Sequence, residues 1–232
     1  MDILKIVIMG LIEGITEFLP ISSTGHLIVA NDLLGFNQVM GDPEVAKAFE
    51  IVIQLGAILA VVVAFPHRFI GLLNFRENRG FSGLRGIGLL VVTSIPVSVL
   101  GLALHKLIKE RLFNPWTVAV ALAVGAVWIL LVEGLEFLGP EKKRSSVDKL
   151  SWHDALTIGI FQCFSLWPGM SRSASTILGG MIGGLDRKTA TEYSFFAAVP
   201  VMVAATGYEL LGCYKYLSSA NITAFAIGFV VS

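Results

Sequence analysis

The chain has 232 residues, of which 55% are hydrophobic and only 15% charged, whereas ordinary soluble domains carry about 25% charged residues. Its mean hydropathy is +0.77, which is too apolar for a soluble domain of this length but is compatible with a lipid-facing exterior. The 17 basic and 17 acidic residues balance, so nothing indicates a nucleic-acid partner. We therefore expect one all-α, polytopic transmembrane domain over residues 1–232.

The first element is an interrupted apolar segment at 3–34. Its start lacks the basic region and cleavage site of a signal peptide and carries Glu13 and Glu17, so we expect it to remain in the mature protein. The sequence FLPISSTGH at 18–26 interrupts the pattern, because Pro, Gly and consecutive Ser residues end helices. Broken backbone is tolerated in a membrane only inside protein or along a watery cavity. The segment therefore predicts a re-entrant helical hairpin with a polar tip.

Four uninterrupted stretches further along the chain reach the length of about 20 residues that a span requires. They are 48–66, 86–104, 116–138 and 193–211. Between the last two, the region 153–185 is interrupted by LWPGMSRSAST at 166–176, which predicts a second re-entrant hairpin. A last apolar run begins at Ile222 and is too short to span by Ser232, so we expect it to continue beyond this sequence. About six transmembrane helices would then result.

Basic residues predict which loops face the cytoplasm. The loops 67–85 and 139–152 are rich in them, with Arg68, Arg76, Arg79 and Arg85 in the first and Lys142, Lys143, Arg144 and Lys149 in the second. By the positive-inside rule both are cytoplasmic, which agrees with the two spans that join them. The loop 105–115 then lies outside despite its own basic residues. The two hairpins consequently enter the membrane from opposite sides.

The two halves of the chain show weak internal similarity. FEIVIQLG (49–56) parallels YSFFAAVP (193–200), and Pro20-x-Ser22-Ser23 parallels Pro168-x-x-Ser171-Arg172. Similar halves of opposite topology predict an inverted repeat, with the site at the repeat interface near the midplane. We place the first repeat at about 1–104 and the second at about 116–232.

Ionisable residues within apolar segments are candidate site residues, because burying them in a membrane is costly. Glu13 and Glu17 are four residues apart and share one helical face. We interpret them as a hard-cation site for Mg²⁺ or Ca²⁺; the alternative is a pair of buried acids hydrogen-bonded to the Ser/Thr loop. Glu50 and Gln54 are again four apart, and we expect them to line the same cleft, as we do for Glu192 and Ser194 in the second half. A purely structural polar role is the alternative for all four.

The first tip carries four candidate residues: Ser22, Ser23, Thr24 and His26. Hydroxyl and free N–H groups at such a tip can hold a phosphate or supply a nucleophile. His26 is a candidate general acid or base; a structural polar role is the alternative for it.

The second tip carries Arg172, flanked by Ser171, Ser173 and Thr176. An arginine in an apolar hairpin requires an anionic partner. That partner is either a phosphate, which a guanidinium binds bidentately, or Glu17 or Glu13 in a structural ion pair.

From the residues alone two functions remain open. One is a metal-assisted phosphatase acting on a lipid phosphate, and the other is a secondary transporter or flippase for an anionic or lipid-phosphate substrate. Two acids beside a Ser/Thr/His loop favour hydrolysis. No pattern encodes an oligomeric state, and a homodimer is left open.

The motifs EGITEFLPISSTGH (13–26) and PGMSRSAST (168–176) resemble those of the undecaprenyl-diphosphatases of the bacitracin-resistance type. The similarity extends through FEIVIQLGAILAVV (49–62) and EYSFFAAVP (192–200) and covers essentially the whole chain. One departure is Ala174, where the family usually has Gly.

This resemblance implies hydrolysis of undecaprenyl diphosphate to the monophosphate carrier of cell-wall precursors, with dependence on Mg²⁺ or Ca²⁺. It implies a bacterial cytoplasmic membrane and a site open to the extracytoplasmic side. Matched by motif position, the acidic pair is Glu13 and Glu17, the Ser/His element is Ser22, Ser23 and His26, and the phosphate-binding arginine is Arg172 with Ser171, Ser173 and Thr176. We expect Ser23 to attack as nucleophile or to position a water, with His26 or Glu17 handling the proton.

Overall fold

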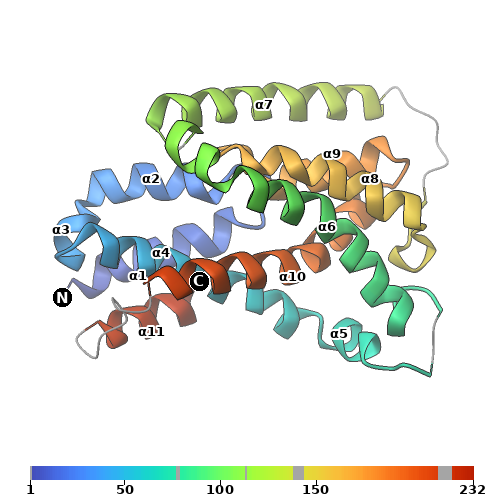
Figure 1. Ribbon diagram of the computed structural model, residues 1–232, viewed down its shortest axis with the longest axis horizontal. Helices are drawn as coiled ribbons and strands as arrows, with labels where there is room; N and C mark the ends of the chain where they lie inside the picture. Colours follow the sequence, from blue (N-terminus) through green and yellow to red (C-terminus); the bar gives the residue numbers. More distant parts are fainter. Residues whose placement is uncertain (1, 77–78, 113, 138–143, 214–220) are drawn as a thin grey trace.

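The computed structural model describes residues 2–76, 79–112, 114–137, 144–213 and 221–232. Every regular element among them is a helix, apart from an isolated bridge between Arg144 and Leu185. Lys142 and Lys143 of the predicted cytoplasmic loop lie outside the described residues. The helices run roughly along one common direction, with α3 and α11 at one end and α5 at the other (Figure 1).

Within the described ranges four helices are long and apolar enough to cross a membrane, which confirms the predicted polytopic α-helical class. They are α4 (Pro43–Ala64), α6 (Gly83–Leu107), α7 (Pro115–Phe137) and α10 (Arg187–Cys213). The helices α6 and α10 contain their predicted spans and extend beyond both ends of them. Helix α4 begins five residues before its predicted span of 48–66 and ends two residues short of it, and α7 begins one residue before its predicted span of 116–138 and ends at Phe137. The early starts follow from flanking residues that supply good helix ends. At α4, for example, Asp42 accepts from the Glu44 N–H and Pro43 occupies the first turn, where a missing N–H costs nothing.

The two interrupted segments form helix–break–helix hairpins, as predicted. The first consists of α1 (Ile3–Thr16) and α2 (Ser23–Leu34). The second consists of α8 (Trp152–Gln162), the short 3₁₀ helix η3 (Cys163–Leu166) and α9 (Arg172–Ile182). The first arm has 14 residues and is about 21 Å long, which is shorter than the hydrocarbon core of about 30 Å. An arm of this length is too short to cross the hydrocarbon core by itself.

The second arm of each hairpin starts in the same way. Ser22 caps α2 by accepting from the Gly25 N–H, and Ser171 caps α9 by accepting from the Ala174 N–H. These caps make the helices resume at Ser23 and Arg172, inside the predicted breaks, because the serine oxygens satisfy exposed N–H groups. Ser22 has φ 67°, a conformation uncommon for residues other than glycine.

The buried apolar side chains form two separate clusters. One surrounds Phe49 on α4 and includes residues of α1, α2, α3 (Phe36–Met40) and α11 (Ile222–Val231). The other surrounds Tyr193 on α10 and includes residues of α6, α8 and α9. Phe49 and Tyr193 are the first residues of the two stretches that the repeat alignment pairs. The proposed repeat bounds themselves remain a prediction.

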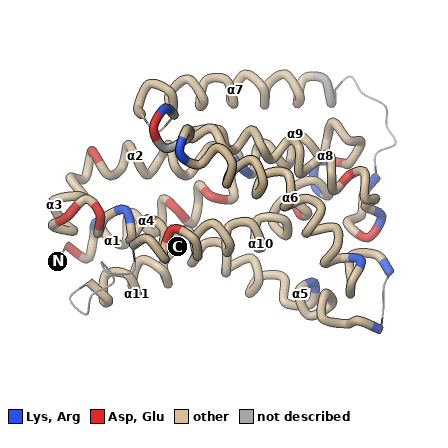
Figure 2. The backbone as a smooth tube through the Cα atoms, in the orientation of Figure 1, with Lys and Arg blue, Asp and Glu red and all other residues tan. Residues whose placement is uncertain are grey.

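Charged residues gather at the two ends of the bundle. Figure 2 shows Lys and Arg at the end where α5 (Pro66–Leu72) and the start of α8 lie. Here Arg68 contacts both Asp148 and Glu192, at 3.2 and 3.3 Å. The position of Glu192 corrects our placement of this residue on the site cleft. Glu192 lies near the start of α10, and its carboxylate contacts Arg68 at the end of the bundle that is rich in arginine.

A substitution at Gly159 tests how closely α8 packs on α6. A Cβ at this position would lie 2.5 Å from the Thr93 carbonyl oxygen, so Gly159→Ala should lower the free energy of unfolding by about 1–3 kcal/mol through overpacking. Gly207→Ala on α10 is the matched control, because no atom lies within 4 Å of the added methyl. Unfolding in detergent micelles measures both, and equal stability of the two variants would contradict close α6–α8 packing.

Candidate active site

The tips of the two hairpins meet inside the bundle and are joined by an ion pair. Arg172 Nη2 lies 2.9 Å from Glu17 Oε1, and their side chains are 10% and 8% exposed. A second contact reinforces the junction, in which Ser173 Oγ donates to the Leu19 carbonyl at 3.0 Å. The structural partner that we considered for Arg172 is therefore present, and it is Glu17 rather than Glu13.

Ser23 lies against the same glutamate. Its hydroxyl donates to Glu17 Oε2 at 2.7 Å, and both side chains are buried. The two carboxylate oxygens of Glu17 thus divide between the Ser23 hydroxyl and the Arg172 guanidinium. A hydroxyl in contact with a carboxylate base is the arrangement required of an activated nucleophile.

Arg172 is held from its other side by α10. Its Nη1 donates to the Ser194 carbonyl at 3.1 Å and approaches the Ser194 hydroxyl at 3.4 Å. Thr176 shares a 2.6 Å hydrogen bond with that hydroxyl. Ser194, which we had placed on the cleft only as the counterpart of Glu50, therefore holds the arginine in place. Alignment of the two spans was the sequence signal that identified it.

Glu13 is fully buried, and among the described residues neither of its carboxylate oxygens makes a hydrogen bond of ordinary length and angle. Glu17, Glu50 and Arg172 act on it electrostatically, and the Ser23 hydroxyl, which donates to Glu17, lies near enough to interact with it as well. A buried carboxylate without a donor is costly, and a cation would satisfy it. Within the described ranges no cluster of three His, Cys, Asp or Glu side chains is suited to hold a metal. Two carboxylates together with substrate phosphates, however, form a common Mg²⁺ environment.

The remaining predicted residues lie either at the hairpin tips or nearer the end of the bundle at α3. Ser22 and Ser171 act as helix caps. The His26 ring is exposed, and its Nδ1 lies 2.8 Å from the Ser22 carbonyl, so Glu17 rather than His26 contacts the Ser23 hydroxyl. Glu50 accepts a hydrogen bond from Asn31 at 3.0 Å.

A polar cavity of about 750 Å³ leads from the first tip toward the end of the bundle at α3. Thr24, Glu50 and Gln54 line it. Sequence reasoning missed its outer residues, which come from four helices and the π-helical turn Ile108–Leu112: Asn31, Lys47, His105, Ile108 and Glu209. They are too far apart in sequence for any motif to group them.

Known proteins resemble this chain over nearly its whole length. Residues 6–232 match the family model described as bacitracin resistance protein BacA. A relative from Maridesulfovibrio salexigens named undecaprenyl-diphosphatase is 55% identical over 97% of this chain and 82% of its own length. Relatives of the same name from Nitratidesulfovibrio vulgaris strain DP4 and Neisseria meningitidis serogroup C are 56% and 49% identical. They cover 100% and 99% of this chain and 84% and 81% of their own lengths, respectively.

The ion pair between the tips should behave as one energetic unit. Glu17→Gln is expected to lower the free energy of unfolding by about 3–5 kcal/mol, because it leaves the buried Arg172 without a counter-charge. Arg172→Met should cost a similar amount. The double variant should lose less than the sum of the two, with a coupling of about 0.5–3 kcal/mol.

Chemical unfolding in detergent measures all three variants. Glu44→Gln is the control, since Glu44 is exposed at the start of α4. Strictly additive losses would show that the two tips are not coupled through this pair.

Proposed function

Because the chain belongs to the bacitracin resistance protein BacA family, we propose that it hydrolyses undecaprenyl diphosphate to undecaprenyl phosphate and orthophosphate. Its relatives named undecaprenyl-diphosphatase cover nearly the whole chain at 49–56% identity. The proposal rests on the position of Glu17, which contacts both the Ser23 hydroxyl and the Arg172 guanidinium. This arrangement brings a nucleophile, a base and a phosphate-binding cation together. The reaction recycles the lipid carrier and would account for bacitracin resistance.

In the proposed mechanism the terminal phosphate replaces Glu17 as the partner of Arg172. The planar guanidinium then binds phosphate oxygens and stabilises the charge that builds on the transferred phosphoryl group. Ser194 and Thr176 keep the guanidinium oriented while its partner changes. Ser171 and Ser173 lie beside it at the start of α9, where N–H groups favour an anion.

Ser23 attacks the terminal phosphorus, and its proton passes to Glu17 Oε2. The phosphoanhydride bond breaks, undecaprenyl phosphate leaves, and water then hydrolyses the phosphoserine to orthophosphate and Ser23. A water placed by Ser23 and deprotonated by Glu17 is the alternative first step. Rapid-quench labelling with radioactive phosphate distinguishes the two, since only the covalent route gives labelled Ser23.

We further propose that Glu13 and Glu17 hold Mg²⁺ or Ca²⁺ together with the diphosphate. The unpartnered carboxylate oxygens of Glu13 support this. The ion would act as a Lewis acid on phosphate oxygens. We place the protein in the bacterial cytoplasmic membrane with the polar cavity on the extracytoplasmic side, because the arginine-rich loops lie at the opposite end of the bundle. A homodimer remains a proposal without support from the described contacts.

The deciding experiment is phosphate release from undecaprenyl diphosphate by purified protein, with Mg²⁺ or EDTA, beside Arg172→Ala. Release that requires both the metal and Arg172 supports the phosphatase and its site together. Absence of release from folded protein would favour the alternative, a transporter or flippase that uses the same residues to bind an anion.

Arg172→Lys tests the role of the guanidinium. Lysine keeps the charge but loses the planar pair of donors, so kcat should fall by about 10²-fold or more, as for loss of one transition-state donor. Steady-state kinetics measure the change, and Arg76→Lys, at an exposed position away from both cavities, is the matched control. Near-normal turnover of Arg172→Lys would remove this residue from the catalytic role.

A further inference from the structure

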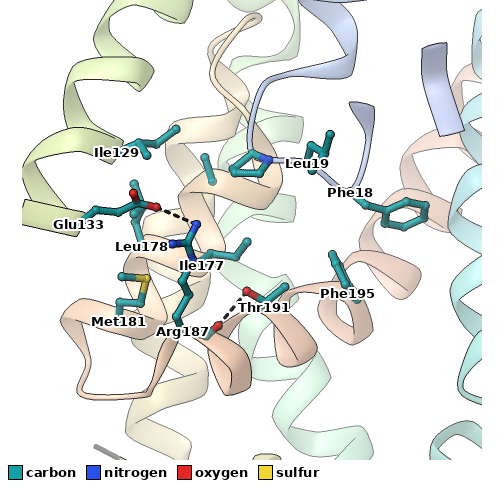
Figure 3. A pocket seen from close by; sticks show the side chains of 12 residues that line it. Phe18, Leu19, Ile129, Glu133, Ile177, Leu178, Met181, Arg187, Thr191 and Phe195 are labelled. Atoms are coloured by element: carbon teal, nitrogen blue, oxygen red, sulfur yellow. Dashed lines mark hydrogen bonds and ion pairs between the residues drawn. The ribbon is translucent and has the colours of Figure 1, made fainter. Parts of the chain in front are cut away.

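A second cavity, of about 290 Å³, lies on the other side of the tips from the polar cavity. Its walls are α9, the first turns of α10, the C-terminal half of α7 and the chain just after Glu17 (Figure 3). Leu19 and Pro20, between Glu17 and Ser22, form one end of it. Leu19 is the residue whose carbonyl binds Ser173, so this cavity adjoins the candidate active site directly.

The α9 wall is a continuous apolar stripe. Ala174, Ile177, Leu178 and Met181 all line the cavity, and their spacing places them on one helical face. Ala174 lies two residues after Arg172, while Met181 lies two turns further on, about 10 Å along the helix. The stripe therefore leads from the catalytic arginine away from the reacting groups.

The few polar groups of this cavity are already satisfied. The Thr191 hydroxyl donates to the Arg187 carbonyl at 2.8 Å, and Arg187 Nη2 pairs with Glu133 Oε1 at 2.8 Å (Figure 3). The other cavity, in contrast, is lined by Asp32, Lys47, Glu50 and other polar side chains. The cavity beside α9 therefore suits an apolar ligand.

We infer that the α9 cavity binds the first isoprene units of the substrate, which this site would hold while the diphosphate lies at the tips. This assignment rests on the proposed function, because a prenyl diphosphate has to place an apolar chain beside its reacting phosphate. The volume accommodates the start of a tail and not its whole length. The cavity thereby favours substrates with a tail longer than one isoprene unit.

Met181→Trp, which fills the far end of the cavity, tests the assignment. The substrates are undecaprenyl diphosphate and dimethylallyl diphosphate, whose five carbons do not reach Met181. For the long substrate kcat/KM should fall by about 10-fold or more, mainly through KM, as for other misfits in an apolar pocket. The value for the short substrate should stay unchanged.

Ile182→Trp is the matched control. Ile182 is the next residue of α9 but is 53% exposed and does not line the cavity, so both substrates should behave as with the unaltered protein. Equal losses for both substrates in Met181→Trp, or no loss for either, would overturn the assignment. If the unaltered protein hydrolysed neither undecaprenyl diphosphate nor dimethylallyl diphosphate, the proposed function would be overturned instead.

A measurement on the unaltered protein covers the case in which Met181→Trp does not fold. A prenyl diphosphate with a diazirine on its second isoprene unit should label residues of the α9 stripe on irradiation. Labelling confined to the polar cavity would contradict the assignment, whether or not the protein hydrolyses the probe.

Discussion

The structure depends on one buried ion pair, between Glu17 and Arg172. Each residue lies at the tip of a hairpin that ends within the bundle, and 155 positions separate them in sequence. Burying either charge alone would cost several kcal/mol, so each hairpin requires the other. The pair also places Ser23 on Glu17 and directs Arg172 toward Ser194. Assembly of the fold and assembly of the candidate active site are therefore the same event.

The polar layer at the tips lies between two apolar clusters, one around Phe49 and one around Tyr193. Polar side chains at this depth are tolerated because they bind one another, as Thr176 and Ser194 do. The exceptions among the described residues are the carboxylate of Glu13, the side-chain amide of Gln162 and the Nε of Arg172. The unsatisfied Glu13 carboxylate, beside a phosphate-binding arginine, is a reasonable place for a cation. The cavities on either side of this layer differ in polarity, which matches the two ends of a lipid diphosphate.

Much of the fold could be predicted from hydropathy and helix-ending residues. The four spans and both hairpins follow from patterns that the bilayer imposes on any chain. The tip residues were identified because serine, histidine and charged residues are rare in such segments. Glu192 was wrongly placed on the site cleft because we inferred its position from the weak similarity between the two halves of the chain. That similarity could not predict its contact with Arg68. The outer residues Lys47, His105 and Glu209 could not be grouped, since they lie on different helices.

The sequence by itself determined the membrane class, the two interrupted segments, the family and the set of reactive side chains, because each of these is written in local composition and spacing. Only the tertiary structure decided which of those side chains touch. It paired Arg172 with Glu17 and left Glu13 without a partner, and it put Glu17 rather than His26 on Ser23. These choices depend on how two hairpins from opposite ends of the bundle meet, and no local pattern encodes that geometry.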